Sequence, residues 1–210
     1  MTMAHDEALT ELDESQRRVE STLASLTDAQ ARAASLLPGW TRGHLVSHLA
    51  RNADALNRFA AGVLDGTPRE MYPGGREARA AAIEEGADRP VALLAADFRF
   101  AGRRLLDSLR GIGPELLDTP VNWRKPVTAR DIPLLRWHEL EIHHLDLGLG
   151  YSCRDWPVSF VESTLESQLP ELAVAAPDVT PPDLPRAELL AWLIGRPTRD
   201  GLPELPAWPF

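Results

Sequence analysis

Four long segments of this chain carry the residue pattern of helices, and they limit the possible fold more than any other feature. In residues 5–25, four apolar residues recur at gaps of three, seven and four, the spacing of an amphipathic helix packed on a core. They are Leu9, Leu12, Val19 and Leu23. The other helices are expected from Thr41, a suitable N-cap, to about Leu64, from near Pro90 through Leu109, and from about Arg130 to Leu149. Together the four segments predict a mainly α fold, a four-helix bundle.

Two connections between these helices are long and contain short elements of their own. Residues 65–68, Asp-Gly-Thr-Pro, end the second helix, and residues 69–88 then form a crossover with a short helix expected at about 76–85. The second connection, residues 114–129, has room for a short extended stretch. The bundle is therefore expected to have long crossover connections rather than tight turns.

The last 55 or so residues differ from the rest in composition. They include a proline-rich run, residues 176–185, that is unsuited to central strands. Helices are expected at about 158–172 and 186–194. We therefore divide the chain into a bundle domain, residues 1–152, and a short, helical, proline-rich C-terminal region, residues 153–210, that is small and reduced.

Composition narrows the classes of partner. With 210 residues, 44% of them hydrophobic, the chain can bury one substantial core. A formal net charge of −9 argues against nucleic acid and anionic membranes, which require clustered Lys and Arg, so a small-molecule ligand is expected. The single cysteine, Cys153, excludes an internal disulfide and fits a reducing cytoplasm. The polar N-terminus and the lack of eighteen consecutive apolar residues predict neither export nor a membrane span.

Three residues far apart in the chain form a candidate metal site. Glu139 and His143 are four apart, which on a helix places both side chains on one face. His48 lies two turns inside the second predicted helix. Two histidines and one carboxylate leave coordination positions open, as a catalytic ion requires, and this set suits zinc but also iron, nickel or manganese.

The metal hypothesis has a simpler alternative. On the fourth helix, Glu139 and His143 interrupt a stripe of apolar residues, and a carboxylate there is costly to bury unless it is paired or bound to a metal. An ordinary Glu–His ion pair, with His48 as a hydrogen-bonded core histidine, would also satisfy this pattern. Local spacing alone does not separate the two.

The chain resembles the mycothiol-dependent maleylpyruvate isomerases and the wider DinB/YfiT-like group of metal-binding four-helix bundles. The resemblance covers about residues 35–150 and rests on GWTRGHLVSHLARNADAL, TPREMYPGGREARAAAIEEG and RWHELEIHHLDLG. It implies a DinB-like bundle in which His48, Glu139 and His143 hold a divalent ion, usually zinc. It also implies mycothiol as cofactor and a substrate-binding arginine in a glycine-arginine segment, here AWLIGRPTRDG, where Arg196 is the candidate and Arg199 its rival.

The activity that this resemblance implies is a thiol-dependent cis–trans isomerisation of maleylpyruvate to fumarylpyruvate, or of a related unsaturated diacid. The metal-bound thiolate of the cofactor would be the nucleophile, adding to the double bond and leaving after rotation. A mycothiol-dependent S-transferase in detoxification or natural-product biosynthesis and a non-catalytic metal-binding protein remain alternatives. The oligomeric state is open.

Several nearby residues have two interpretations each. Asn52 and Asp146 are candidates to orient a ligand of the metal, with Asn52 a candidate cofactor contact, but Asn52 also suits a solvent-facing position and Asp146 a pair with a surface cation such as Arg136. His44 precedes His48 by one turn but has no matching third ligand, and a surface position is expected. Trp40 is the one tryptophan expected to rim the site. His138 and His144 lie about 100° from the ligands around the helix and are expected to be solvated or to pack on neighbours.

Overall fold

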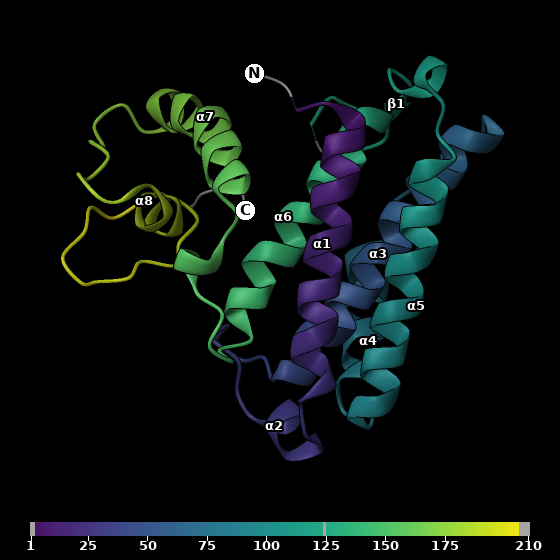
Figure 1. The fold of residues 1–210 in the computed structure, drawn as a ribbon, viewed down its shortest axis with the longest axis horizontal. Helices are drawn as coiled ribbons and strands as arrows, with labels where there is room; N and C mark the ends of the chain where they lie inside the picture. The colour runs from purple at the N-terminus through teal and green to yellow at the C-terminus, as the bar shows by residue number, and fades with distance from the viewer. Residues whose placement is uncertain (1–2, 124, 206–210) are drawn as a thin grey trace. The chain divides into compact units, whose positions relative to one another are not determined.

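The chain divides into two compact units between Leu149 and Gly150. The computed structural model describes residues 3–123 and 125–205. The first unit is a bundle of four long helices (Figure 1): α1 (His5–Ala24), α3 (Arg42–Asp65), α5 (Val91–Arg110) and α6 (Ile132–Asp146). This arrangement confirms the predicted mainly α, four-helix architecture.

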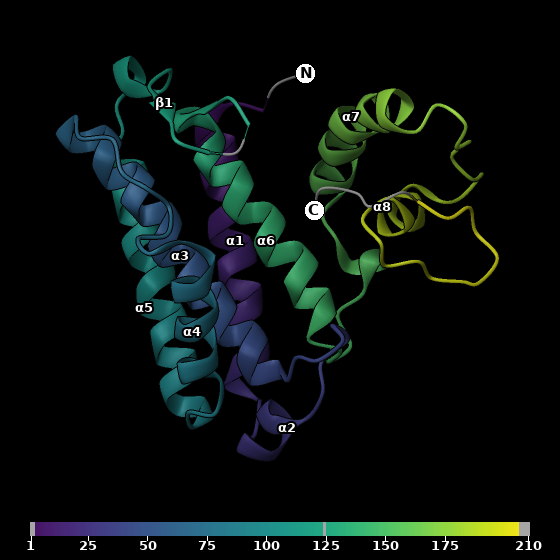
Figure 2. The same ribbon diagram turned by 180° about the vertical axis from the view of Figure 1, so that it is seen from behind.

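The bundle helices pack around one apolar core. Helix α3 contacts α5 and α6, and α1 contacts the same two helices. Figure 2 shows α3 and α5 running beside each other on one side of the bundle, and α6 beside α1 on the other. The core is built mainly from leucine, valine and phenylalanine side chains at helical spacing, including Leu12, Val19, Leu45, Leu49, Leu56, Phe98, Leu105 and Leu140. Burial of these apolar stripes holds the helices together.

The connections contain the short elements that the sequence indicated, and one that it did not. Helix α4 (Gly75–Ala87) occupies the first crossover, where a short helix was predicted. In the second connection, β1 (Pro120–Val121) pairs antiparallel with β2 (Val127–Thr128), between the single-turn helices η1 (Pro114–Leu116) and η2 (Ala129–Asp131). Helix α2 (Asp28–Arg32) was not predicted.

Helix α4 packs closely against α3 because a glycine lies at the contact. A Cβ atom added at Gly43 would lie 2.1 Å from the carbonyl oxygen of Ala87. The side chain of Ser47, one turn further along α3, donates a hydrogen bond to the carbonyl of Ile83 at 3.0 Å. Helix α4 is therefore held on the same end of α3 that carries His48.

A buried carboxylate joins α6 to α1. The side chain of Glu141 is fully buried, and its Oε1 accepts hydrogen bonds from Ser15, Arg18 and Trp137. Because a buried charge is tolerated only when it is paired and hydrogen-bonded, these donors account for its position. The contact fixes the rotation of α6, the helix that carries two of the candidate ligands.

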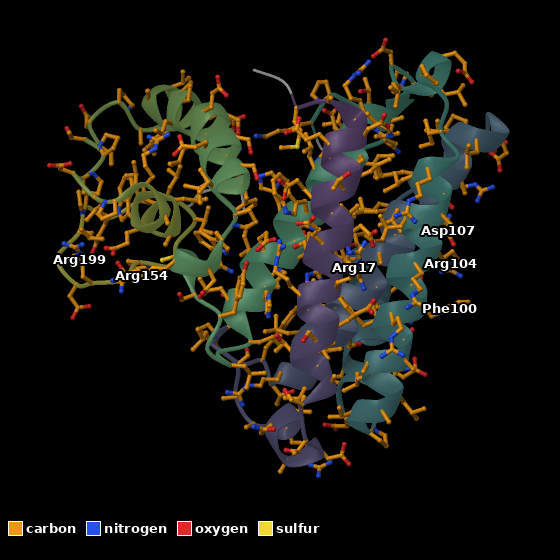
Figure 3. The ribbon with its side chains drawn as sticks, in the orientation of Figure 1. Arg17, Phe100, Arg104, Asp107, Arg154 and Arg199 are labelled. Carbon is orange, nitrogen blue, oxygen red and sulfur yellow. The ribbon has the colours of Figure 1, made fainter. Side chains whose placement is uncertain are left out.

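The second unit contains η3 (Cys153–Asp155), α7 (Val158–Ala175) and α8 (Arg186–Leu193), so both helices expected in this region are present. Helix α8 packs on α7 and on η3. Within this unit, Glu188 accepts hydrogen bonds from Arg154 at 3.2 Å and from Arg199 at 2.7 Å. Both arginines are labelled in Figure 3. In the described parts of the chain, no helix is long and apolar enough to cross a membrane.

Candidate metal centre

The helix that carries His48 begins with a capping box. Thr41 Oγ1 accepts a hydrogen bond from the backbone N–H of His44, and Nδ1 of His44 accepts one from the backbone N–H of Thr41 at 3.2 Å. The predicted N-cap is therefore confirmed. His48 lies one turn beyond the box, with 3% of its surface exposed. Its ring is directed at α6.

The structure brings the three predicted ligands together. His48 Nε2 lies 2.9 Å from Glu139 Oε2, and His143 Nε2 lies 3.5 Å from the same oxygen. The rings of His48 and His143 are 4.8 Å apart and nearly perpendicular. Each residue offers one ligand atom, and all three atoms lie within 4.8 Å of one another.

These distances fit a divalent ion. Ligand atoms about 2.1 Å from a tetrahedral ion lie about 3.4 Å from each other. The two histidine-to-carboxylate distances, 2.9 and 3.5 Å, bracket that value. Two imidazole nitrogens and one carboxylate oxygen also leave one position or more for an external ligand, so the donor set fits a catalytic rather than a structural zinc ion.

A second layer of contacts holds the two histidine rings. Asp146 is buried, and its Oδ2 lies 2.8 Å from Nδ1 of His143. A carboxylate in this place orients the ring and keeps Nε2 free to bind an ion. On the other side, Nη2 of Arg79 donates to Nδ1 of His48 at 3.1 Å. The ring of Trp40 meets His48 edge-on, with centroids 5.5 Å apart, at the border of the site as expected.

The electrostatics of the surrounding side chains favour an ionised carboxylate between the histidines. Burial alone would raise the pKa of Glu139, but hydrogen bonds from His143 and His48 hold it well below its usual range. Burial would likewise lower the pKa of His143, and its contacts with Asp146 and Glu139 outweigh burial and raise it. Burial lowers the pKa of His48, against the opposing effect of Glu139. The three groups thus share one strongly polar centre inside the bundle.

Asn52 and Arg136 form a separate buried pair beside this centre. Asn52 is 2% exposed, not solvent-facing, and its Oδ1 accepts a hydrogen bond from Nη1 of Arg136 at 2.8 Å. Arg136 also donates to the carbonyl of Leu49 at 2.8 Å. Burial lowers the pKa of Arg136 to about 10. The interpretation of Arg136 as a surface cation pairing with Asp146 is therefore wrong, because Asp146 pairs with His143.

Three other histidines, His44, His138 and His144, have hydrogen-bond partners outside the ligand set. His44 is part of the capping box, and its Nε2 lies 3.1 Å from Glu84. His138 Nδ1 bonds the carbonyl of Leu134 at 2.7 Å. His144 is buried, with Nε2 2.7 Å from Thr22 Oγ1. The expected surface position of His44 is wrong, since its side chain is only 15% exposed.

A family model described as the mycothiol maleylpyruvate isomerase N-terminal domain matches residues 12–148. This stretch is more than half of the chain and contains all three candidate ligands. The chain belongs to this family. The membership confirms the resemblance that the sequence motifs carried, and with it the DinB-like character of the bundle.

Solved structures of the family share the fold of the whole chain. The crystal structure of the mycothiol-dependent maleylpyruvate isomerase matches with a TM-score of 0.86 at 24% identity, covering 100% of this chain and 99% of that one. A variant of that isomerase with one histidine replaced by alanine matches with a TM-score of 0.86 at 23% identity, covering 99% and 100%. No curated protein sequence gives a match. Because both solved chains are covered almost end to end, the C-terminal region has a counterpart in them, and the expected reduction finds no support in this coverage.

Arg196 lies in the C-terminal unit. It follows α8 after Gly195, and its Nη1 donates to the carbonyl of Ile194 at 2.7 Å. Both Arg196 and its rival Arg199 line a cavity of about 550 Å³ formed by residues 192–205. Cys153 is buried, and burial raises the pKa of its thiol, which disfavours a thiolate there.

Sequence reasoning missed the contribution of the crossover to the site. Arg79 on α4 touches His48, and its guanidinium lies 5.5 Å from the centre of the Tyr72 ring. The crossover motif TPREMYPGGREARAAAIEEG supports the family resemblance but indicates no role for its individual residues. An arginine and a tyrosine in an otherwise polar connection gave no periodic signal that pointed to His48.

Proposed function

We propose that this member of the family is a metal- and thiol-dependent cis–trans isomerase of maleylpyruvate or a related unsaturated diacid. We propose zinc as the ion, mycothiol as the thiol and the cytoplasm as its location. The observation that carries the proposal is the convergence of His48, Glu139 and His143 from two helices, with ligand atoms within 4.8 Å, in a chain of this family. An ion pair alone would not need the second histidine.

The side chains of the site are suited to hold an ion and to keep its open position usable. A zinc ion, when bound, supplies the positive charge that keeps an external thiol ionised at neutral pH. Glu139 contributes a carboxylate that stays ionised, and the two histidines contribute Nε2 atoms. Asp146 fixes the tautomer of His143 by accepting the proton on Nδ1.

Two further roles are proposed from the sequence motifs. Asn52 lies one turn after His48 on the same helix, and we propose it as a cofactor contact. Its side chain also hydrogen-bonds Arg136 and the hydroxyl of Tyr72. Arg196 is proposed as a catalytic, substrate-binding residue that grips a carboxylate with its planar guanidinium. Support for Arg196 is its place in a glycine-arginine segment on the rim of a cavity of the C-terminal unit.

The proposal is tested by metal content and ligand binding of purified wild type and His48→Ala. We expect about one zinc per chain in wild type, loss of that zinc in the variant, and mycothiol binding by calorimetry only when zinc is present. His44→Ala is the matched control: it lies one turn earlier on α3, outside the ligand set, and should retain zinc. A wild-type protein that takes up no zinc contradicts the proposal.

Product analysis then separates the remaining activities. Incubation with maleylpyruvate and mycothiol should give a product of unchanged mass, because an isomerase returns the thiol. A product heavier by the mass of the thiol would indicate an S-transferase instead. Zinc binding without thiol affinity would indicate a non-catalytic metal-binding protein.

A further inference from the structure

Arg79 is a positive charge at the candidate metal centre, and no carboxylate of the described residues forms an ion pair with it. It contacts neutral groups, Nδ1 of His48 at 3.1 Å and Tyr72, whose ring centre is 5.5 Å away and whose hydroxyl it hydrogen-bonds. Burial raises the pKa of Tyr72, against the opposing effect of Arg79, so the phenol stays protonated and does not neutralise the guanidinium. Within residues 3–123 and 125–205, no carboxylate forms an ion pair with Arg79, whereas Arg51 and Arg89 both pair with Asp97.

The contact between Arg79 and His48 places the guanidinium at the candidate metal centre. Nη2 of Arg79 lies 3.1 Å from Nδ1 of His48, and Nε2 of the same ring lies 2.9 Å from Oε2 of Glu139. The charge of Arg79 is therefore separated from the ligand atoms by a single imidazole ring.

The ring of Tyr72 gives the guanidinium a support that does not depend on His48. A guanidinium over an aromatic face is held electrostatically and keeps its edge N–H groups available for other acceptors. Arg79, Tyr72 and the three candidate ligands all belong to the unit Ala4–Leu149. An anion bound by Arg79 would therefore lie next to the ion, and a carboxylate matches its fork of donors.

We propose that Arg79 binds a carboxylate of the substrate beside the metal ion. The inference rests on the proposed function and names its substrate class, an anion whose carboxylate is close to the reacting double bond. Arg79 would provide a carboxylate-binding site inside the bundle, in addition to the one proposed for Arg196.

The test is calorimetric titration of maleate, a small cis-dicarboxylate, into zinc-loaded wild type, Arg79→Gln and Arg76→Gln. Arg76 lies one turn earlier on α4 and is exposed, so its variant is the matched control. We expect Arg79→Gln to weaken maleate binding at least about tenfold and Arg76→Gln to leave it unchanged. Metal-free wild type should bind maleate more weakly than the zinc-loaded protein. If Arg79→Gln does not fold, Arg79→Lys replaces it, because lysine keeps the charge and loses the bidentate geometry.

Zinc affinity is measured in the same variants, which separates the two proposals. Arg79→Gln should still bind zinc, since Arg79 is not one of the three candidate ligands. Zinc-loaded wild type that binds no maleate, or an Arg79→Gln protein that binds it equally well, overturns the inference and leaves the proposed function intact. Wild type that takes up no zinc overturns both.

Discussion

Replacement of Asp146 by alanine should weaken zinc binding without disturbing the bundle. In the structure its carboxylate is buried and lies 2.8 Å from Nδ1 of His143, on the side of the ring opposite the candidate ion. The backbone carbonyl of Asp146 accepts a hydrogen bond from the N–H of Leu36 at 2.8 Å, and a side-chain substitution leaves this bond in place. The substitution therefore removes the carboxylate that orients His143 and raises its pKa.

The expected size of the effect follows from the kind of contact that is lost. Removal of a carboxylate that orients a metal-bound histidine costs about 10- to 100-fold in metal affinity, or roughly 1.4 to 2.7 kcal/mol. Asp146→Asn should cost less than Asp146→Ala, because the amide oxygen can still accept from Nδ1. Asp107→Ala removes an exposed aspartate on α5, labelled in Figure 3, and should have no effect.

The assay is competition for zinc against a chelator at several pH values, because Asp146 raises the pKa of His143 and proton competition therefore differs between wild type and the variant. The Kd values are compared at the high-pH plateau, where they no longer change with pH. Thermal unfolding of the metal-free variants by circular dichroism confirms that each is folded. If Asp146→Ala and wild type bind zinc within about twofold of each other, the contact with His143 has no role in metal binding. The reasoning about the second layer of the site would then be refuted.

Three further predictions concern pH and packing. Asp146 and Glu139 raise the pKa of His143, and below that pKa zinc must displace a proton from the ring. The zinc Kd should therefore fall about tenfold per unit of rising pH until it levels off, and a flat profile contradicts this. Glu141→Ala leaves buried donors without their acceptor and should lower the free energy of unfolding in urea by about 3–5 kcal/mol, whereas exposed Glu14→Ala should change it by less than about 1 kcal/mol. Gly43→Ala forces a methyl group against the backbone of α4 and should lower the free energy of unfolding by about 1–3 kcal/mol in the same assay. Gly111→Ala, whose added methyl would meet nothing nearer than 3.3 Å, should cost less, and equal costs would refute the packing argument.

The helices and the ligand set were accessible from sequence because both depend on local spacing. Apolar residues at helical intervals located the bundle helices to within a few residues, and Thr41 marked the start of α3 through a capping box. The positions of His48, Glu139 and His143 followed from helix periodicity and from the family motifs. Whether an ion binds there stays a prediction.

The polar interior of α6 was not accessible in the same way. This helix contacts both α1 and α3, so its buried arc is wider than a single apolar stripe and includes Arg136, Glu141 and His144. Each of them hydrogen-bonds a partner more than 80 positions away in sequence, and a single sequence does not show which distant residues pair. Arg79 was missed for a related reason, since its importance depends on how α4 folds back onto α3.

The separation of the ligands along the chain has a consequence for folding and turnover. His48 and Glu139 are 91 positions apart, and an ion bound by both would act as a cross-link between two helices that are otherwise joined through half the chain. A ligand present at 100 times its Kd adds about 2.7 kcal/mol to the stability of the native state. For a protein of ordinary marginal stability, that increment changes the unfolded fraction about 100-fold. Zinc starvation would therefore be expected to remove the protein by proteolysis, so that its abundance as well as its activity follows the metal supply of the cell.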